Sequence, residues 1–120
     1  MKHILVVEDD LDTIEIVELI LKDECYTVTK ITEVVTVLQI ADLSPDLVIV
    51  DFMLSFGLGD DLCLDIKNHE ATKHIPVILY SASPHLEKIV SRCKADAFIA
   101  KPFDLDHFLA VIHTLTNREN

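Results

Sequence analysis

Short apolar runs alternate with amphipathic stretches five times along the chain. The apolar runs predict strands at residues 3–7, 26–31, 47–50, 76–80 and 97–100. The stretches that follow them space their hydrophobic residues as helices do, and predict helices at 11–23, 33–41, 60–69, 84–93 and 104–117. Near-continuous apolar strands that alternate with helices are buried on both faces. The pattern therefore predicts an α/β fold with a parallel sheet between two layers of helices.

Two of the predicted helices have a regular apolar face. It is formed by Leu11, Ile14, Val17 and Leu21 in the first helix and by Leu105, Phe108, Ile112 and Leu115 in the last. Ser83 and Pro84 predict the N-cap and first turn of the fourth helix. The segment between the third strand and the third helix holds both glycines of the chain, Gly57 and Gly59, and is predicted to be a loop.

The composition fits one domain, and we expect residues 1–120 to form it. Hydrophobic residues make up 50% of the chain, which is enough for a core without disulfides or a structural metal. The formal net charge is -11. A surface this acidic repels phosphate backbones and anionic lipid, so direct binding to nucleic acid or to a membrane is not expected.

The chain contains no apolar run near the roughly 20 residues that a membrane span requires, and its first residues lack the pattern of a signal peptide. We therefore expect a cytoplasmic location. The three cysteines, Cys25, Cys63 and Cys93, are odd in number and widely spaced. This spacing predicts reduced, buried side chains and not disulfides.

Four of the predicted strands end in polar residues. These are Glu8, Asp9 and Asp10 after the first strand, Asp51 after the third, Ser81 after the fourth and Lys101 after the fifth. Taken singly, an acidic residue there is often a helix cap or turn former, a serine a cap and a lysine a solvated charge. In open parallel sheets, however, ligands bind outside the carboxyl ends of the strands. We therefore expect these residues to converge on one edge of the sheet.

Together the strand-end residues have a chemical logic. Two carboxylates about 4 Å apart repel each other by on the order of 4 kcal/mol at an effective dielectric of about 20, so the cluster needs a cation. All-oxygen ligation with open water positions suits Mg²⁺, or Mn²⁺ in its place. A hydroxyl and an ammonium group beside the cluster suit a phosphoryl group. A carboxylate that faces a phosphoryl group is a nucleophile that can form an aspartyl phosphate.

At this point the chain resembles the receiver domains of bacterial response regulators in two-component signalling, over essentially its whole length. Four segments carry the resemblance, in order: Ile-Leu-Val-Val-Glu-Asp-Asp at 4–10, Pro-Asp-Leu-Val-Ile-Val-Asp at 45–51, Ile-Pro-Val-Ile-Leu-Tyr-Ser-Ala at 75–82 and Ala-Asp-Ala-Phe-Ile-Ala-Lys-Pro-Phe at 95–103. The resemblance implies a flavodoxin-like (βα)5 doubly wound sandwich, with a five-stranded parallel sheet of order 2-1-3-4-5.

The resemblance also implies the function. Such a domain accepts a phosphoryl group from a histidine kinase or a histidine phosphotransfer protein and signals to a downstream effector protein or domain. It catalyses its own phosphorylation and dephosphorylation and is otherwise not an enzyme. Position by position, Asp51 matches the phosphoacceptor and Lys101 the lysine that binds the phosphoryl oxygens. Glu8, Asp9 and Asp51 match the residues that hold Mg²⁺, with Asp9 the expected direct ligand.

Several further roles come from the same resemblance. Met53 would give its backbone carbonyl to the metal, whereas Asp10 lies outside the acidic pair and is expected to cap the first helix. Ser81 and Phe98 match the switch residues, which would change the face made by 84–93, 97–100 and the helix from 104. The peptide before Pro102 is often cis in this family.

The chain departs from the family pattern at two loop positions. Ser55 stands where the family often has proline, and Lys94 where it usually has glycine, whereas the glycine at 59 is present. The end of the fourth helix is therefore expected to lack easy access to positive φ at Lys94. These positions carry no chemistry, so they affect the shapes of loops and not the phosphorylation.

Other interpretations remain open. The chain can be a receiver fragment of a longer regulator or hybrid kinase, although a start close to the first strand mildly favours a stand-alone receiver. A phosphatase of the haloacid dehalogenase type would carry Asp-x-Asp after the first strand, a spacing that Asp10 and Asp12 have, but the chain leaves no room for a cap domain. A non-phosphorylated interaction module is disfavoured because every chemical position is filled.

Overall fold

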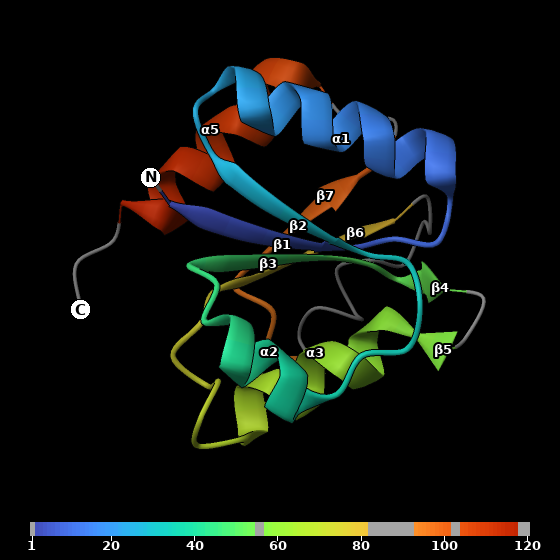
Figure 1. The fold of residues 1–120 in the computed structure, drawn as a ribbon, viewed down its shortest axis with the longest axis vertical. Coiled ribbons are helices and arrows are strands. Elements are labelled where there is room, and N and C mark those ends of the chain that lie inside the picture. The colour runs from blue at the N-terminus through green and yellow to red at the C-terminus, as the bar shows by residue number, and fades with distance from the viewer. Residues whose placement is uncertain (1, 55–56, 82–92, 102–103, 118–120) are drawn as a thin grey trace.

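Five strands form one parallel sheet in the computed structural model, which describes residues 2–54, 57–81, 93–101 and 104–117. The strands are β1 (His3–Val7), β2 (Thr27–Ile31), β3 (Leu47–Asp51), β6 (Val77–Ser81) and β7 (Ala97–Ala100), in the order β2-β1-β3-β6-β7 (Figure 1). A separate antiparallel pair, β4 (Met53–Leu54) and β5 (Gly57–Leu58), accounts for the gap in the numbering. Without that pair the order is 2-1-3-4-5, as predicted.

Helices cover both faces of the sheet, which confirms the predicted α/β class. Helices α1 (Leu11–Asp23) and α5 (Leu105–Thr116) lie on one face, and α2 (Val37–Leu43) and α3 (Gly59–Asn68) lie on the other (Figure 1). Alternate strand residues supply the two cores: Ile4 and Val6 face α1 and α5, whereas Leu5 and Val7 face α2 and α3. The predicted helix at 84–93 and the Pro102 peptide fall on residues outside the described ones, apart from Cys93. Among the described helices, none is long and apolar enough to cross a membrane.

The apolar faces of α1 and α5 are shorter than predicted. Three residues of each predicted face are buried, namely Ile14, Val17 and Leu21 in α1 and Phe108, Ile112 and Leu115 in α5. The fourth residue is exposed in each case, Leu11 to 63% and Leu105 to 47%. Both leucines begin a helix that follows the carboxyl end of a strand. The sheet ends beneath that first turn, so these two side chains have no core to pack against.

Helix α2 starts four residues later than the predicted 33–41. Thr36 is its N-cap: the Thr36 hydroxyl accepts from the Gln39 N–H at 3.2 Å, and the Gln39 side chain accepts from the Thr36 N–H at 2.8 Å. This reciprocal capping box satisfies two backbone donors and fixes the start of the helix. The Thr-x-x-Gln spacing is visible in the sequence, so the prediction overlooked an available signal.

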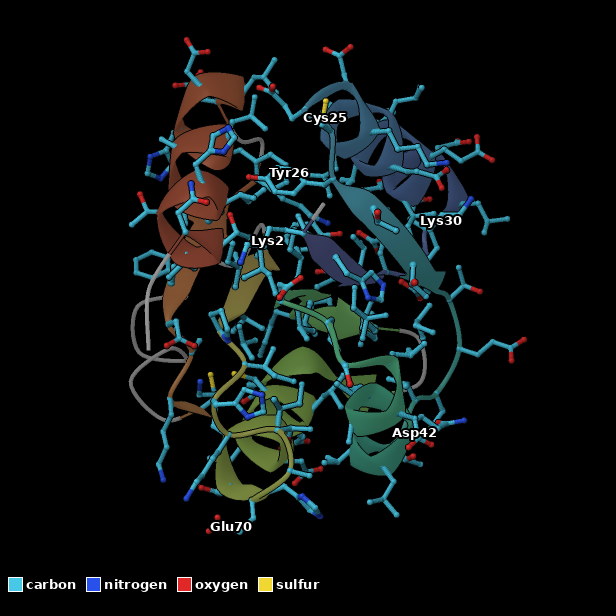
Figure 2. All side chains as sticks on the ribbon, turned by 60° about the vertical axis from the view of Figure 1, so that its left-hand side comes forward. Lys2, Cys25, Tyr26, Lys30, Asp42 and Glu70 are labelled. Carbon is cyan, nitrogen blue, oxygen red and sulfur yellow. The ribbon has the colours of Figure 1, made fainter. Side chains whose placement is uncertain are left out.

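The prediction that all three cysteines are buried is wrong for Cys25, whereas Cys63 and Cys93 are buried. Cys25 has φ 67 and lies just after α1, where its N–H donates to the Lys22 carbonyl (3.0 Å). The Tyr26 N–H donates to the Leu21 carbonyl (3.0 Å), which completes a Schellman C-cap. The left-handed position of that motif points its side chain outward (Figure 2), so Cys25 is exposed for a backbone reason.

The loop predicted after β3 contains the short antiparallel pair β4 and β5, after which the chain returns to the end of β3. The Gly59 N–H donates to the Phe52 carbonyl at 2.7 Å. A Cβ atom at residue 59 would lie 2.1 Å from the carbonyl oxygen of Asp51, so the close approach requires glycine. The start of α3 therefore packs directly on the backbone at the end of β3.

Lys94 adopts the positive φ that its side chain was expected to make difficult. Its φ is 64, and its ammonium group donates to the Asn68 side chain at 3.0 Å. The chain therefore keeps the left-handed turn that a glycine would form at lower cost.

We expect Lys94→Gly to raise the free energy of unfolding by about 0.5 kcal/mol, because glycine adopts positive φ without Cβ strain. Urea denaturation measures the change. Lys94→Ala is the matched control, since it removes the bond to Asn68 and keeps the Cβ. An equal gain in stability from the alanine and glycine variants would contradict a backbone origin.

Candidate functional site

The polar residues at the carboxyl ends of the strands converge as the sequence predicts. The Lys101 ammonium, after β7, lies 3.2 Å from Glu8 Oε1, after β1, and 3.3 Å from Asp51 Oδ2, at the end of β3. One carboxylate oxygen each from Glu8, Asp9 and Asp51 lie within 4.8 Å of one another. Three carboxylates thus lie close together at one edge of the sheet, and two of them, Glu8 and Asp51, contact the same ammonium group. We call these four residues the acidic cluster.

Glu8 is fully buried and its two oxygens are held by different donors. Oε1 accepts from the Tyr80 hydroxyl at 2.6 Å and from Lys101 at 3.2 Å. Oε2 accepts from the Asp10 backbone N–H at 3.2 Å. Both oxygens of this buried side chain therefore have hydrogen-bond donors, as buried polar groups require.

Tyr80 is a site residue that the sequence analysis missed. It occupies the fourth position of β6, opposite Asp51 in the register of β3 and β6, and its ring is fully buried. The Lys101 ammonium lies 4.3 Å from the centre of that ring. Burial, followed by the hydrogen bond to Glu8, raises the pKa of the Tyr80 phenol far above its ordinary value, so the group stays protonated and donates. A tyrosine inside an apolar strand is itself a signal, because a buried phenol usually finds a polar partner.

Asp51 is buried enough to be costly as an anion. Burial and then the neighbouring Glu8 raise its pKa from 3.8 to about 6, against the opposing effects of Lys101 and the Met53 N–H. Lys101 donates to Oδ2 and the Met53 N–H donates to Oδ1 at 3.2 Å. The carboxylate is therefore oriented by a donor on each oxygen and is incompletely neutralised.

Asp10 stands apart from the acidic cluster, as predicted. It is exposed and is the N-cap of α1, where its carboxylate accepts from the Thr13 N–H at 3.1 Å and from the Thr13 hydroxyl. The cap places negative charge at the positive end of the helix dipole. Its side chain is committed to the helix, while its backbone N–H supports Glu8.

The remaining predicted residues lie near the same edge. Ser81 is buried at the end of β6, and its carbonyl accepts from the Lys101 N–H at 2.9 Å. Phe98, on β7, is half-buried and packs against the core cluster on the α2 and α3 side. Met53 has a 61% exposed side chain, and its N–H is the group that contacts Asp51.

The donor set of the acidic cluster fits a hard divalent cation. Its potential ligands are carboxylate oxygens, and the three that approach one another come from two adjacent strands. Mg²⁺ and Mn²⁺ prefer such oxygen ligands and keep several waters when few protein ligands are present. Glu8, Asp9 and Asp51 are thus the residues that could hold the ion.

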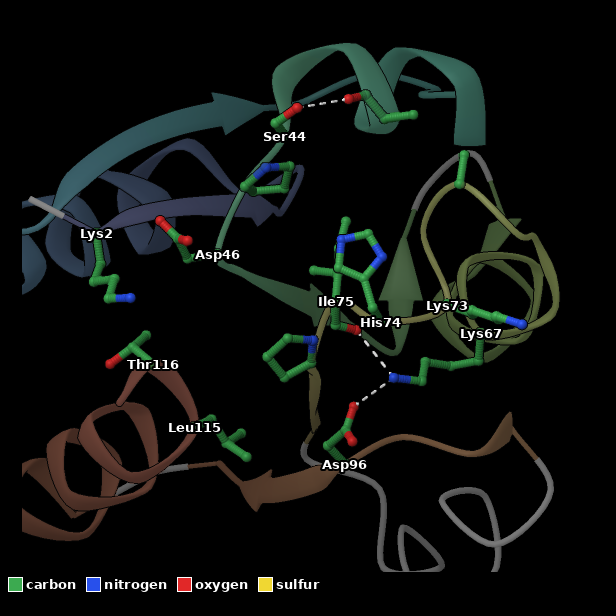
Figure 3. A pocket seen from close by; sticks show the side chains of 14 residues that line it. Lys2, Ser44, Asp46, Lys67, Lys73, His74, Ile75, Asp96, Leu115 and Thr116 are labelled. Carbon is green, nitrogen blue, oxygen red and sulfur yellow. Dashed lines mark hydrogen bonds and ion pairs between the residues drawn. The ribbon is translucent and has the colours of Figure 1, made fainter. Parts of the chain in front are cut away.

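A separate cavity of about 380 Å³ opens at the opposite end of the sheet. Its lining includes Lys2, Asp46 and Thr116 (Figure 3). Lys67 also lines it and donates to the Ile75 carbonyl at 3.0 Å and to Asp96 at 2.9 Å, as the dashed lines in Figure 3 show. The cavity therefore does not belong to the acidic cluster, which lies at the carboxyl ends of the strands.

Comparison with known proteins agrees with the fold. Residues 4–113 match the family model described as the response regulator receiver domain. Response regulator ArlR of Staphylococcus epidermidis is 34% identical over 122 residues, which cover 99% of this chain and 54% of ArlR. Protein PilG of Pseudomonas aeruginosa is 31% identical over 112 residues, 91% of this chain and 83% of PilG.

Solved structures give the same result. The crystal structure of the response regulator TrrA from Thermotoga maritima, in complex with Mg²⁺-BeF, superposes with a TM-score of 0.80 at 26% identity and covers 96% of this chain and 99% of that one. The chain belongs to the response regulator receiver domain family of two-component signalling. It spans about half the length of several curated relatives that it matches.

Proposed function

We propose that residues 1–120 form a phosphorylatable receiver, in which Asp51 accepts a phosphoryl group with the help of Mg²⁺. The observation that carries the proposal is the placement of Lys101 between Glu8 and Asp51, at 3.2 Å and 3.3 Å. This arrangement places the Asp51 carboxylate at the carboxyl end of β3, beside an ammonium group. Glu8 and Asp9, the pair proposed to bind the cation, lie next to it. Among the relatives, the TrrA structure holds Mg²⁺ and BeF, which supports the same chemistry here.

In the proposed reaction, an Asp51 oxygen attacks the phosphorus of the donor. A new O–P bond forms while the bond from phosphorus to the donor nitrogen or oxygen breaks, and the donor keeps the electron pair of that bond. The Met53 N–H and Lys101 orient the carboxylate before attack. Lys101 then offsets charge on the phosphoryl oxygens. A divalent cation would be held by Glu8, Asp9, Asp51 and the Met53 carbonyl. When bound, it would further neutralise the charge on the phosphoryl oxygens.

The donor and the output are parts of the same proposal. A histidine kinase or histidine phosphotransfer protein would donate the phosphoryl group, and an effector protein or domain would respond, all in the cytoplasm. Phosphorylation would draw the Ser81 hydroxyl toward Asp51 and let Phe98 turn inward, which changes the face around β7 and α5. The half-buried state of Phe98, which packs against the core on the α2 and α3 side, supports such a movement. The domain would act on itself and have no other substrate.

Acetyl phosphate with Mg²⁺ is expected to add one phosphoryl group to the wild-type chain, seen by intact mass. Asp51→Asn should abolish the adduct because the amide cannot form the acyl phosphate. Asp42→Asn, which changes an exposed carboxylate on α2, is the matched control and should be labelled like wild type. Wild-type labelling of Asp51→Asn would refute the assignment. Absence of label in every variant would instead favour an interaction module that works without phosphorylation.

A further inference from the structure

Tyr80, Glu8 and Lys101 make a closed triangle of contacts. The Tyr80 hydroxyl donates to Glu8 Oε1 at 2.6 Å, Lys101 donates to the same oxygen at 3.2 Å, and the ammonium group lies 4.3 Å from the centre of the Tyr80 ring. The ring is fully buried in the core on the α1 and α5 side. Packing therefore prevents the ring from swinging away, and the phenol has a fixed direction.

The triangle determines which Glu8 oxygen is available. Oε1 accepts from a phenol at 2.6 Å and from an ammonium group at 3.2 Å, whereas Oε2 accepts from the Asp10 N–H at 3.2 Å. A carboxylate that is pinned through one oxygen presents the other in a set direction. A ligand that is already oriented binds a cation more tightly, since less freedom is lost on binding.

The triangle also shares Lys101 between two carboxylates. If the phenol were absent, Lys101 would remain as the side-chain donor to Glu8 Oε1. Its ammonium group would then be drawn toward that buried carboxylate. With the phenol present, Lys101 stays above the ring and within 3.3 Å of Asp51. The ring face adds an attraction that keeps the ammonium group in place.

We propose that Tyr80 is a positioning residue, which turns Glu8 toward the cation and keeps Lys101 shared with Asp51. The inference rests on the proposed function, because it concerns how well the same site binds its cation and its phosphoryl group. In this proposal Tyr80 contacts neither the cation nor the phosphoryl group and acts through Glu8 and Lys101.

Tyr80→Phe tests the proposal, since it keeps the ring and removes one oxygen. We expect the dissociation constant for Mg²⁺, measured by calorimetry well below the unfolding temperature, to increase about ten-fold. The maximal rate of phosphorylation by acetyl phosphate at saturating Mg²⁺ should fall less, because Lys101 keeps its aromatic platform. Tyr80→Leu removes the platform too and should lower that maximal rate further.

Tyr26→Phe is the matched control. It removes a phenol that bonds His113 (2.7 Å) and Thr116 (3.3 Å), far along the sheet from the acidic cluster. It should leave the Mg²⁺ affinity unchanged. An unchanged affinity in Tyr80→Phe, or an equal loss in Tyr26→Phe, would overturn the positioning role while leaving the phosphorylation of wild type intact. A wild-type chain that binds no Mg²⁺ would overturn both this role and the metal-assisted function.

A second measurement needs no change at Tyr80. The chain has two tyrosines and no tryptophan, so Tyr80 is the remaining tyrosine in the Tyr26→Phe variant. Its near-ultraviolet absorbance should shift during a Mg²⁺ titration, with the same midpoint as calorimetry. Binding of Mg²⁺ without any spectral response would show that the phenol does not sense the orientation of Glu8 and would overturn the proposal.

Discussion

Gly59→Ala is expected to lower the free energy of unfolding by about 3 kcal/mol, the largest stability effect we predict. The added Cβ would lie 2.1 Å from the carbonyl oxygen of Asp51, 2.8 Å from its carbonyl carbon and 2.9 Å from Val50 Cγ1. Two of these atoms are backbone in a central strand, so they cannot move aside as a flexible side chain would. Relief requires α3 to shift away from β3, which breaks the 2.7 Å bond from the Gly59 N–H to Phe52.

Gly57→Ala is the control for Gly59→Ala in urea denaturation. Gly57 has φ +149 and nothing within 4 Å of an added Cβ, so its substitution should cost about 1–2 kcal/mol of conformational strain and no collision. Equal losses in the two variants would show that the close approach to Asp51 is not what requires glycine at 59. Any Gly59→Ala chain that remains folded should also be phosphorylated more slowly, since the strand carrying Asp51 is the part displaced.

Asp51→Asn is expected to stabilise the chain by on the order of 2–3 kcal/mol above pH 7, and hardly at all at pH 4. The pKa of Asp51 is raised from 3.8 to about 6, chiefly by burial and then by Glu8. The folded chain therefore binds the proton more tightly than the unfolded chain. Stability linked to this group is fully present below about pH 4 and is lost as the pH rises through about 6. Asparagine resembles the protonated acid and avoids that loss.

The measurement is thermal or urea unfolding of both proteins from pH 4 to pH 8. Comparison of the two cancels the other groups that titrate in the same range. Glu18→Gln is a control of opposite sign, because the bonds from Lys30 and then Lys22 lower the pKa of Glu18. That variant should be the less stable one at neutral pH, with the difference shrinking in acid. If the difference in free energy of unfolding between wild type and Asp51→Asn is constant from pH 4 to pH 8, a raised pKa at Asp51 is excluded.

The strands and the acidic cluster could be predicted from the sequence because strong local patterns determine them. Apolar runs such as Leu47–Val50 have few alternatives to a buried strand, and the parallel topology then brings their carboxyl ends together. Asp51 and Lys101 are 50 residues apart and still lie 3.3 Å apart. This proximity follows from strand order alone, without knowledge of any side-chain contact.

The predictions failed where tertiary contacts or backbone conformations decide the outcome. The bond from Tyr80 to Glu8 depends on the direction of one buried ring, which hydrophobic periodicity does not encode. Cys25 and Lys94 adopt left-handed φ although neither is glycine. For Cys25 the C-cap of α1 requires that conformation. Leu11 fits the helical spacing of α1 and is nevertheless exposed, because spacing does not show where the sheet beneath a helix ends.

The described chain starts and finishes on the same side of the sheet. Lys2, just before β1, and Thr116, at the end of α5, line one cavity at the edge opposite the acidic cluster. Figure 1 shows both ends on that side. An affinity tag, a surface anchor or another folded unit joined at either end would therefore attach facing away from Asp51. The domain can be tethered or immobilised through either end while its reactive edge stays open to an approaching donor.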